Sequence, residues 1–383
     1  MVHCLALDFG ASSIRVVDIA LEGGRLCQHE LARLANGPVS HGGHLIWDYP
    51  KIFSWLERTL CTAGACGVSY ASVGADSWGV DYVLLDGAGQ VIGAPVSYRD
   101  PRSAGQIDKI AAYIPPAGLY AATGIANLSF NTLYQLAAQA ESTPQDLQQA
   151  ARLLFTADYV HYWLSGVAAN ERTLASTSQM LGLDGAWQTS LLRHLGLPDR
   201  VLPSLVAPGT ALGPVRSSFG LSAQVIAPAS HDTQSAILAV PAVGDDWAYL
   251  SSGTWSILGV ESPVPFTGPA ALAAGIGNEA GFGGTFCVQS TVTGLWLVQE
   301  ISRQLGGADI ASLALAAAEA TPMRSVINPA DARFLAPPDM IVEIRMAARE
   351  TGEAVPQTPA ELVRCAYDSL ALFYRSKIAE LSA

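Results

Sequence analysis

The N-terminal segment of the chain contains the residue types of an anion-binding turn. A short apolar run ends at Asp8, and Gly10 follows it, which allows a tight turn in which the backbone approaches a ligand closely. Ser12 and Ser13 add hydroxyl donors, and Arg15 adds a fixed positive charge. A strand, a small-residue turn and a returning strand can direct several N–H groups at one anion. Because Asp8 would repel a bare phosphate, the pattern favours a phosphate site beside a divalent cation; an ordinary hairpin is the alternative.

A second group of reactive residue types lies at 228–233, in the sequence Pro-Ala-Ser-His-Asp-Thr. A buried strand is predicted just before it, at 225–227, and a helix just after it, at 233–240. A carboxylate at such a strand-to-helix junction lies where open α/β sheets bind ligands. Asp232 is therefore a candidate site residue, and the alternative is that Asp232 or Ser230 only caps the helix.

Two further segments gather polar groups next to predicted strands. Residues 76–81, Asp-Ser-Trp-Gly-Val-Asp, place polar and aromatic side chains around a glycine just before a predicted strand at 82–85. Residues 251–256, Ser-Ser-Gly-Thr-Trp-Ser, form the tip of a second predicted strand–turn–strand with small hydroxylated residues. Taken alone, residues 76–81 are also typical of a decorated strand entry.

The elements that must position these groups indicate an α/β protein. Segments rich in β-branched residues alternate with helical patterns through most of the chain. Residues 82–85 form a buried-strand pattern, and Asp86 and Gly87 supply a hairpin turn before a second short strand at 91–92. Residues 200–216 are rich in proline and glycine and are predicted to be an extended connection.

Four segments carry helical patterns. Apolar residues recur at helical spacing over 107–114 and 133–140, and a helix start is predicted at Thr143 before a further run to residue 154. Residues 358–361, Thr-Pro-Ala-Glu, are a capping-box pattern with proline at the first helical position, before a helix with one apolar face.

Composition limits the function further. The chain has 383 residues, half of them hydrophobic, and a net charge of −12; its length suggests about two domains. A turn at residues 244–246 could separate them, giving domains 1–244 and 245–383. The absence of a basic patch argues against nucleic acid as a partner. The six cysteines contain no C-x-x-C pair, which argues against a zinc site or a disulfide framework. Neither a signal peptide nor a membrane span is predicted, so a cytoplasmic location is expected.

One motif is rejected. Residues 275–280 match the G-x-G-x-x-A dinucleotide pattern by letter. That pattern requires a strand before it and a helix after it, and the sequence predicts neither.

Eight segments together resemble the FGGY carbohydrate kinases and, within them, the rhamnulokinase group. The resemblance implies two ribonuclease-H-like α/β domains of the actin and hexokinase type around a cleft, the first binding a ketose and the second much of the nucleotide. Members of the family continue beyond the last helix, so the second domain is expected to be incomplete. The matching segments are Asp8–Ser13, Asp76–Asp86, Pro95–Asp100, Phe130–Leu136, Ala229–Thr233, Ser251–Ser256, Gly294–Gln299 and Arg333–Met340.

The resemblance also implies a reaction and a set of site residues. The reaction is transfer of the γ-phosphoryl group of Mg²⁺-ATP to the 1-hydroxyl of L-rhamnulose, in rhamnose catabolism. Asp232 would be the general base, and Asp8 would face Mg²⁺ through water. The implied sugar ligands are Gly79, Asp81, His231, Asp232, Thr233 and Thr291. The implied phosphate and nucleotide ligands are Ala11, Ser12, Ser13, Arg15, Thr254 and Gln299.

Two alternatives remain open on the sequence. The rhamnulokinase group usually has an asparagine where this chain has Thr291, and threonine offers only one hydroxyl in place of an amide. The substrate is therefore L-rhamnulose or another ketose, such as L-fuculose, L-ribulose or D-xylulose. The expected incomplete second domain leaves a sugar-binding homologue without kinase activity as the other alternative.

Overall fold

The computed structural model describes residues 2–244, 246–335 and 337–381. These residues group into two compact units. The first unit combines Met1–Pro241 with Ser262–Ala273 and Asn278–Cys287, and the second combines Ala242–Glu261, Ala274–Gly277 and Val288–Ala383. Asp245, where the predicted second domain begins, and Ala336, within the Arg333–Met340 motif, lie outside the described residues.

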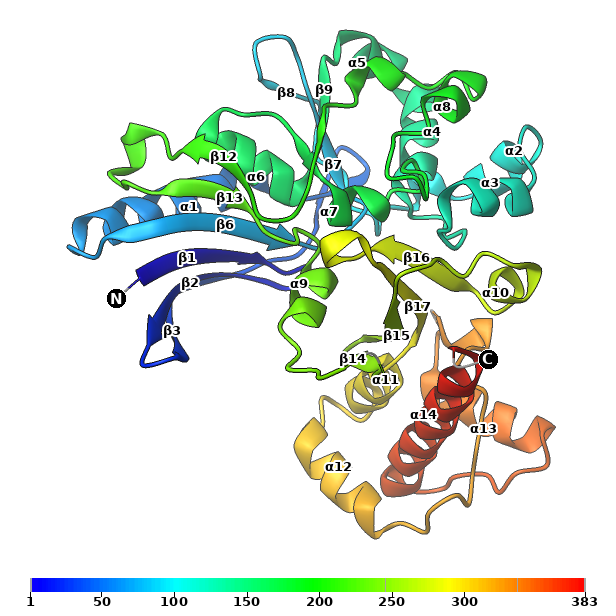
Figure 1. Ribbon diagram of the computed structural model, residues 1–383. Helices are drawn as coiled ribbons and strands as arrows, with labels where there is room; N and C mark the ends of the chain where they lie inside the picture. The colour runs from blue at the N-terminus through cyan, green and yellow to red at the C-terminus, as the bar shows by residue number, and fades with distance from the viewer. Residues whose placement is uncertain (1, 245, 336, 382–383) are drawn as a thin grey trace. The chain divides into compact units, whose positions relative to one another are not determined.

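A six-stranded sheet forms the centre of the first unit (Figure 1). Its order is β12-β13-β6-β1-β2-β3. β1 runs antiparallel to β2 and parallel to β6, and β6 runs parallel to β13. The strands are β1 Val2–Phe9, β2 Ser13–Glu22, β3 Arg25–Ala35, β6 Tyr70–Ser77, β12 Thr210–Pro214 and β13 Gln224–Ala227.

The strands of the sheet form where apolar side chains alternate with more polar ones along the sequence. In β1 the side chains of Leu5, Leu7 and Phe9 are buried and alternate with less buried ones, as expected when successive side chains point to opposite faces. Helix α6, Thr156–Ser165, contacts β6 and β13, and its buried face includes Val160 and Leu164. The parallel strands therefore form a covered core whose carboxyl ends lie at one edge.

The remaining elements of the first unit form small sheets and helices. The small sheets are β4 Val39–His41 with β5 His44–Ile46, β8 Val91–Ile92 with β7 Tyr82–Leu85 and β9 Arg152–Phe155, and β10 Asn170–Glu171 with β11 Leu205–Val206. The α-helices are α1 Tyr49–Ala65, α2 Gln106–Ala111, α3 Pro116–Thr123, α4 Thr132–Ser142, α5 Pro144–Gln149, α7 Arg172–Ser176, α8 Thr189–His194, α9 Asp232–Leu238 and α10 Pro269–Ala273. The 3-10 turns are η1 Pro101–Ser103, η2 Asp199–Val201, η3 Ser217–Phe219 and η4 Phe282–Gly284.

Most predicted elements of the first unit are confirmed, with two corrections. The predicted hairpin is β7 and β8, which pair antiparallel, and the helices predicted near 107, 133 and 233 are α2, α4 and α9. The helix predicted from Thr143 to residue 154 begins as α5 but ends at Gln149, because residues 152–155 form β9, which pairs with β7. Residues 200–216 are more than an extended connection, because β11 pairs with β10 and β12 pairs with β13. The α/β class predicted from the sequence is confirmed.

A further sheet has the order β14-β15-β17-β16. Its strands are β14 Tyr249–Ser252, β15 Trp255–Ser262, β16 Ile276–Ala280 and β17 Phe286–Thr293. The helices of the second unit are α11 Trp296–Gln304, α12 Ile310–Glu319, α13 Met340–Glu350 and α14 Pro359–Leu381, with the 3-10 turn η5 Ala332–Phe334. α11 contacts α12, α13 and α14. Their shared core contains Leu297, Ile301, Phe334, Ile344 and Leu370.

The capping box predicted at the start of α14 is confirmed. The Thr358 N–H donates to Glu361 Oε2 at 3.1 Å, and the Glu361 N–H donates to Thr358 Oγ1 at 3.2 Å. Among the residues that the structure describes, every helix is too short or too polar to serve as a membrane span.

Candidate active site

Three carboxylates gather at the carboxyl edge of the parallel strands. Asp8 near the end of β1 is paired in register with Asp76 near the end of β6. Asp232 begins α9 directly after the turn that leaves β13, and His231 in that turn bridges Ser77 of β6. The carboxyl edge of an open parallel sheet is where ligands bind in α/β proteins. The fold therefore brings together residues from three distant parts of the sequence.

The pKa of the Asp76 carboxyl group is perturbed by its burial and by these neighbouring carboxylates. Burial, together with the charges of Asp8 and Asp232, raises the pKa of Asp76 to about 7. One of its oxygens, Oδ1, is buried and has no hydrogen-bond partner among the described residues. A cation placed near these three carboxylates would relieve their mutual repulsion.

The first predicted phosphate hairpin joins β1 to β2. The Gly10 N–H donates to Ser13 O at 3.0 Å, and a Cβ on Gly10 would lie only 2.8 Å from that oxygen, so a side chain does not fit there. Asn36 holds the tip, since its Nδ2 donates to Gly10 O at 2.9 Å and its backbone N–H donates to Ser12 O at 3.0 Å. Ala11 lies in the same bend, between Gly10 and the start of β2.

Arg15 does not stand free beside this hairpin. It faces Asp8 across the strand pair, its Nε donates to Asp8 Oδ2 at 2.9 Å, and its terminal nitrogen contacts the same oxygen. The two side chains are 43% and 29% exposed. The cation predicted to contact phosphate is thus already paired with the carboxylate predicted to face the metal.

The turn that carries the candidate catalytic residues is held by a buried glutamate. Glu171 is fully buried, and its Oε2 accepts the Ser230 N–H at 2.9 Å. The same carboxylate accepts the Thr173 N–H at 2.9 Å and the Thr173 hydroxyl at 2.5 Å, and the His231 N–H donates to Thr173 Oγ1 at 3.2 Å. Burial raises the pKa of Glu171 to about 7, against the lowering effect of these hydrogen bonds. Glu171 is a positioning residue for the turn before Asp232.

Asp232 combines accessibility with a perturbed carboxyl group. Its side chain is 40% exposed, and its Oδ1 accepts the Thr233 N–H at 2.6 Å and the Thr233 hydroxyl at 3.3 Å. Desolvation by the surrounding protein raises its pKa, while the neighbouring His231 lowers it. A carboxylate whose pKa is moved towards neutrality accepts a proton more readily, which is the property of a general base. Thr233 thus contacts Asp232 directly.

His231 lies between two carboxylates. Its Nδ1 is 2.9 Å from Glu279 Oε2, and its Nε2 is 3.5 Å from Asp232 Oδ1. Burial alone would lower the pKa of His231, but the nearby carboxylates of Glu279, Asp232 and Glu171 together outweigh it, with Glu279 the strongest of the three, and the pKa rises to about 9. The imidazole is therefore cationic at neutral pH.

Gly79 lies in a strained turn that α7 supports. A Cβ at Gly79 would lie 2.8 Å from Thr177 Oγ1. The next residue, Val80, has φ of +68°, a left-handed conformation that is a genuine outlier for a β-branched residue. The Val80 N–H donates to Thr177 Oγ1 at 3.0 Å, and the Thr132 hydroxyl donates to Val80 O at 2.7 Å. Such strain persists only where the surroundings fix the backbone, and it is concentrated at functional sites.

The Asp81 carboxylate accepts hydrogen bonds from buried side chains. Its Oδ2 accepts from the indole N–H groups of Trp47 at 2.6 Å and Trp78 at 2.9 Å, and its Oδ1 accepts from Gln135 Nε2 at 3.2 Å. The side chain is 1% exposed, and burial raises its pKa to about 6 despite these donors. The contacts place Asp81 beneath the Gly79 turn, and its role as a sugar ligand stays a prediction.

The second predicted phosphate hairpin lies in the second unit. β14 and β15 pair around its tip, where Ser252 faces Ser256. The Thr254 hydroxyl donates to Gln299 Oε1 at 3.1 Å, so these two predicted nucleotide ligands lie together. A Cβ at Gly294 would lie 2.7 Å from Gly253 O, so the hairpin approaches the start of α11 closely.

Thr291 lies on β17 and belongs to the second unit. Its side chain is exposed, between the buried Ser290 and Val292. The structure leaves the threonine hydroxyl accessible, and its role in sugar choice stays a prediction.

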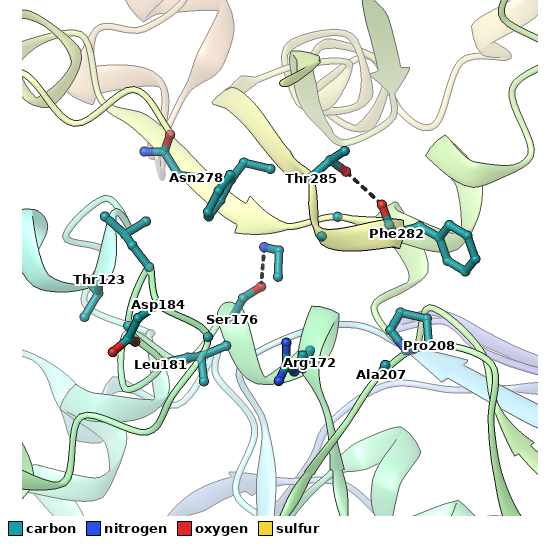
Figure 2. A pocket seen from close by; sticks show the side chains of 18 residues that line it. Thr123, Arg172, Ser176, Leu181, Asp184, Ala207, Pro208, Asn278, Phe282 and Thr285 are labelled. Carbon is teal, nitrogen blue, oxygen red and sulfur yellow. Dashed lines mark hydrogen bonds between the residues drawn. The ribbon is translucent and has the colours of Figure 1, made fainter. Parts of the chain in front are cut away.

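A cavity of about 340 Å³ lies elsewhere in the first unit (Figure 2). Arg172, Ser176 and Phe282 line it, and the Ala280 N–H donates to Ser176 Oγ at 3.0 Å at its wall. Within the part of the chain that the structure describes, the lining residues include none of the site residues predicted from the sequence. The residues predicted from the sequence in the first unit gather at the strand edge, which is the candidate active site.

Sequence reasoning missed three of the side chains that shape the site. Asp76 lies within a recognised segment but has no role assigned from the sequence, and Glu171 is the N-cap of α7, a helix that the sequence does not indicate. Glu279 lies in the rejected dinucleotide pattern, which is strand β16. A carboxylate at the end of an apolar strand could have indicated Asp76, whereas Glu171 and Glu279 are identified only by the tertiary contacts.

The chain matches a family over almost its whole length. Residues 3–239 match the N-terminal domain of the FGGY family of carbohydrate kinases, and residues 248–383 match the C-terminal domain of that family. The chain belongs to this family and is an enzyme, a sugar kinase. The resemblance and the two-domain α/β fold predicted from the sequence are confirmed.

Individual relatives and solved structures show more specific similarities than the family match. The chain is 44% identical to a rhamnulokinase of Pectobacterium carotovorum over 99% of this chain and 77% of that protein. It is 42% identical to a rhamnulokinase of Yersinia pestis over 99% of this chain and 79% of that protein. Among solved structures, a xylulose kinase from Lactobacillus acidophilus matches with a TM-score of 0.78 at 16% identity, over 97% of this chain and 78% of that one. A Plasmodium falciparum glycerol kinase matches with a TM-score of 0.79 at 13% identity, over 99% and 78%.

Sugar kinases of this family act on a sugar and ATP, generally with Mg²⁺. Among the described residues, no group of three or more His, Cys, Asp or Glu side chains could hold a metal ion on its own. Mg²⁺ usually keeps several waters and is held by one or two carboxylates and the phosphates of a substrate. The unpartnered Asp76 oxygen and the neighbouring Asp8 carboxylate fit that kind of site.

Proposed function

We propose that this sugar kinase transfers the γ-phosphoryl group of ATP to the 1-hydroxyl of L-rhamnulose, in the cytoplasm and as a step of rhamnose catabolism. Similarity to proteins named rhamnulokinase at 41–44% identity supports the choice of sugar. The observation that carries the chemistry is Asp232, an accessible carboxylate with a raised pKa at the carboxyl edge of the parallel strands, adjoining His231.

Asp232 acts as the general base in this proposal. The oxygen of the sugar 1-hydroxyl forms a bond to the γ-phosphorus while its proton passes to the Asp232 carboxylate. The bond from the γ-phosphorus to the bridging oxygen breaks, and ADP leaves with that electron pair. Bound Mg²⁺ supplies charge neutralisation on the phosphates, and Asp8 and Asp76 are the residues that would hold it, Asp8 through water.

The other proposed site residues bind and orient the sugar and the nucleotide. His231 and Gly79 hold sugar hydroxyls, with Thr233, Asp81 and Thr291 completing the proposed sugar ligands. The proposed phosphate and nucleotide ligands are Ala11, Ser12, Ser13, Arg15, Thr254 and Gln299. Because phosphoryl transfer depends mainly on positioning and on electrostatic stabilisation, the strained Gly79 turn and the Glu171 contacts support the same assignment.

A second candidate keeps the reaction and changes the ketose. Thr291 is exposed on β17, and threonine offers a single hydroxyl where the rhamnulokinase group usually has an asparagine amide. L-fuculose, L-ribulose and D-xylulose are the alternative substrates.

The test measures ADP release with a panel of these ketoses. We expect L-rhamnulose to give the highest kcat/KM, and Asp232→Asn to lower kcat by about 10²–10⁴-fold, the usual contribution of a positioned base, while the sugar Kd changes by less than about tenfold. Thr291→Asn separates the sugar alternatives, since a changed order of kcat/KM among the ketoses places Thr291 at the sugar. Turnover of Asp232→Asn within threefold of the parent would overturn the assignment of the base.

A further inference from the structure

We propose that Glu279 is a positioning residue that fixes the His231 ring, through Nδ1, so that Nε2–H is presented to the sugar beside Asp232. The inference rests on the proposed function and concerns a residue to which neither the sequence motifs nor the family resemblance gives a role.

The first step is the geometry of the histidine. His231 Nδ1 is 2.9 Å from Glu279 Oε2, which is an ion-pair contact, although Nδ1 has no hydrogen-bond partner of regular geometry among the described residues. A charged imidazole carries a hydrogen on both ring nitrogens, so Nδ1 faces the Glu279 carboxylate as part of an ion pair. The other ring nitrogen, Nε2, then lies 3.5 Å from Asp232 Oδ1. The ring is thus oriented with one nitrogen towards Glu279 and the other towards the candidate base.

The second step is the rigidity of Glu279 itself. Gln234 Nε2 donates to Glu279 Oε2 at 3.1 Å, and Gln234 is 2% exposed. The residues on either side of Glu279 are also held, because the Asn278 N–H donates to Gly124 O at 2.9 Å and the Ala280 N–H donates to Ser176 Oγ at 3.0 Å. A side chain fixed in this way can orient its partner without being moved by it.

The third step is the charge. Three carboxylates face His231 from the elements around it, namely Glu279 on β16, Asp232 on α9 and Glu171 before α7. Glu279 has the largest effect of the three in raising the pKa of His231 to about 9, against the lowering effect of burial. A charged imidazole donates stronger hydrogen bonds to a sugar oxygen than a neutral one does.

The test substitutes Glu279→Gln, which keeps the side-chain shape and removes the charge. We expect the KM for the ketose to rise by about tenfold or more, the factor for one charge-assisted hydrogen bond, with a smaller change in kcat. Asp18→Asn is the matched control, because Asp18 Oδ1 is likewise 2.9 Å from a histidine Nδ1, that of His3.

Nuclear magnetic resonance of ¹⁵N-histidine provides a readout that needs no substrate. The chain has seven histidines, and the His231→Asn variant identifies the signals of His231. We expect Glu279→Gln to lower the pKa of His231 and Asp18→Asn to leave it unchanged. This measurement stands even where the preferred ketose is not L-rhamnulose, so failure of the proposed function and failure of this inference are distinguishable.

A double-mutant cycle excludes a merely structural effect. In the His231→Asn background, Glu279→Gln should cause little further change in KM, because the group that it orients is gone. An unchanged KM and an unchanged His231 titration in Glu279→Gln would overturn the inference, and so would an equal effect of Glu279→Gln with and without His231.

Discussion

At the scale of single residues, the site is defined by carboxylates whose neighbours are also carboxylates. Burial and the charges of Asp8 and Asp232 raise the pKa of Asp76, whereas Glu171 is perturbed by burial and is satisfied by hydrogen bonds. The difference separates groups that await a ligand from groups that hold the protein in place. Asp76 Oδ1, buried and unpartnered among the described residues, belongs to the first kind.

The Asp76 carboxyl should make stability depend on pH. Its pKa is 3.8 in the unfolded reference and about 7 in the folded protein. The folded state therefore keeps a proton that the unfolded chain releases, so the free energy of unfolding falls as pH rises from about 4 to about 7. We expect Asp76→Asn, which carries no charge, to raise Tm relative to the parent, and by more at pH 8 than at pH 5. Differential scanning calorimetry in Mg²⁺-free buffer measures it.

Added Mg²⁺ and ATP should reverse the order of the two Tm values, so that the parent melts at a higher temperature than Asp76→Asn. Because the proposed site uses the Asp76 charge, nucleotide should stabilise the parent more than the variant. An equal Tm difference at pH 5 and pH 8 would contradict the assignment of the shifted carboxyl.

Features that depend on residues close together in the sequence could be predicted, whereas features that depend on distant residues could not. The capping box of Thr358 and Glu361 and the hairpin after β7 were predictable, because each depends on residues a few positions apart. β12 was missed because a proline-rich segment becomes a strand only when β13 lies beside it. The Asp8–Arg15 pair was also missed, since its contact depends on the register of β1 against β2.

The candidate site divides in the same way. The Asp232 and Gly79 segments were recognised from short motifs, and the structure puts both at the carboxyl edge of the sheet. Glu171 and Glu279 could not be identified, because their importance comes from Ser230 and His231, which are distant in the chain. Local sequence shows which residues can react, and tertiary contacts show which residues hold them.

At the scale of elements, Gly294 lets the second hairpin pack against the start of α11. A Cβ there would lie 2.2 Å from Ser256 Oγ and 2.7 Å from Gly253 O. Because moving backbone atoms aside costs free energy, we expect Gly294→Ala to lower the free energy of unfolding by about 1–3 kcal/mol, the usual cost of overpacking. ATP affinity should fall while the sugar Kd stays unchanged, because Thr254 and Gln299 are displaced together.

Gly277→Ala is the matched control for that change. A Cβ at Gly277 would lie 3.9 Å from Gln289 O, which is ordinary contact, so the added methyl group fits. Chemical denaturation and titration calorimetry compare the two variants. Equal stability of the two would show that the hairpin does not need the close approach at Gly294.

At the scale of the whole molecule, the chain enters the first unit more than once. Residues 262–273 and 278–287 belong to the same unit as the first 241 residues. Asn278 alone donates to Gly124 O from both its backbone N–H and its side chain, at 2.9 Å each. The two halves of the sequence therefore do not correspond to two separable pieces.

A chain cut once after Val243 should consequently stay assembled. Val243 is 95% exposed, so a protease site inserted there is accessible. We expect the cut protein to elute at the position of the intact one in gel filtration and to separate into two fragments only in denaturing gels. Separation under native conditions would show that the returning segments do not hold the first unit together.

The order of the strands in the large sheet has a consequence for biosynthesis. β1, β2, β3 and β6 have emerged from the ribosome long before β13, yet β13 is the strand that pairs with β6 and leads to His231 and Asp232. Until then the nascent chain presents the edge of β6 unpaired, which is a surface for misassembly. Pauses in translation after β6 should therefore lower the yield of enzyme more than pauses after β13, although the protein made is identical.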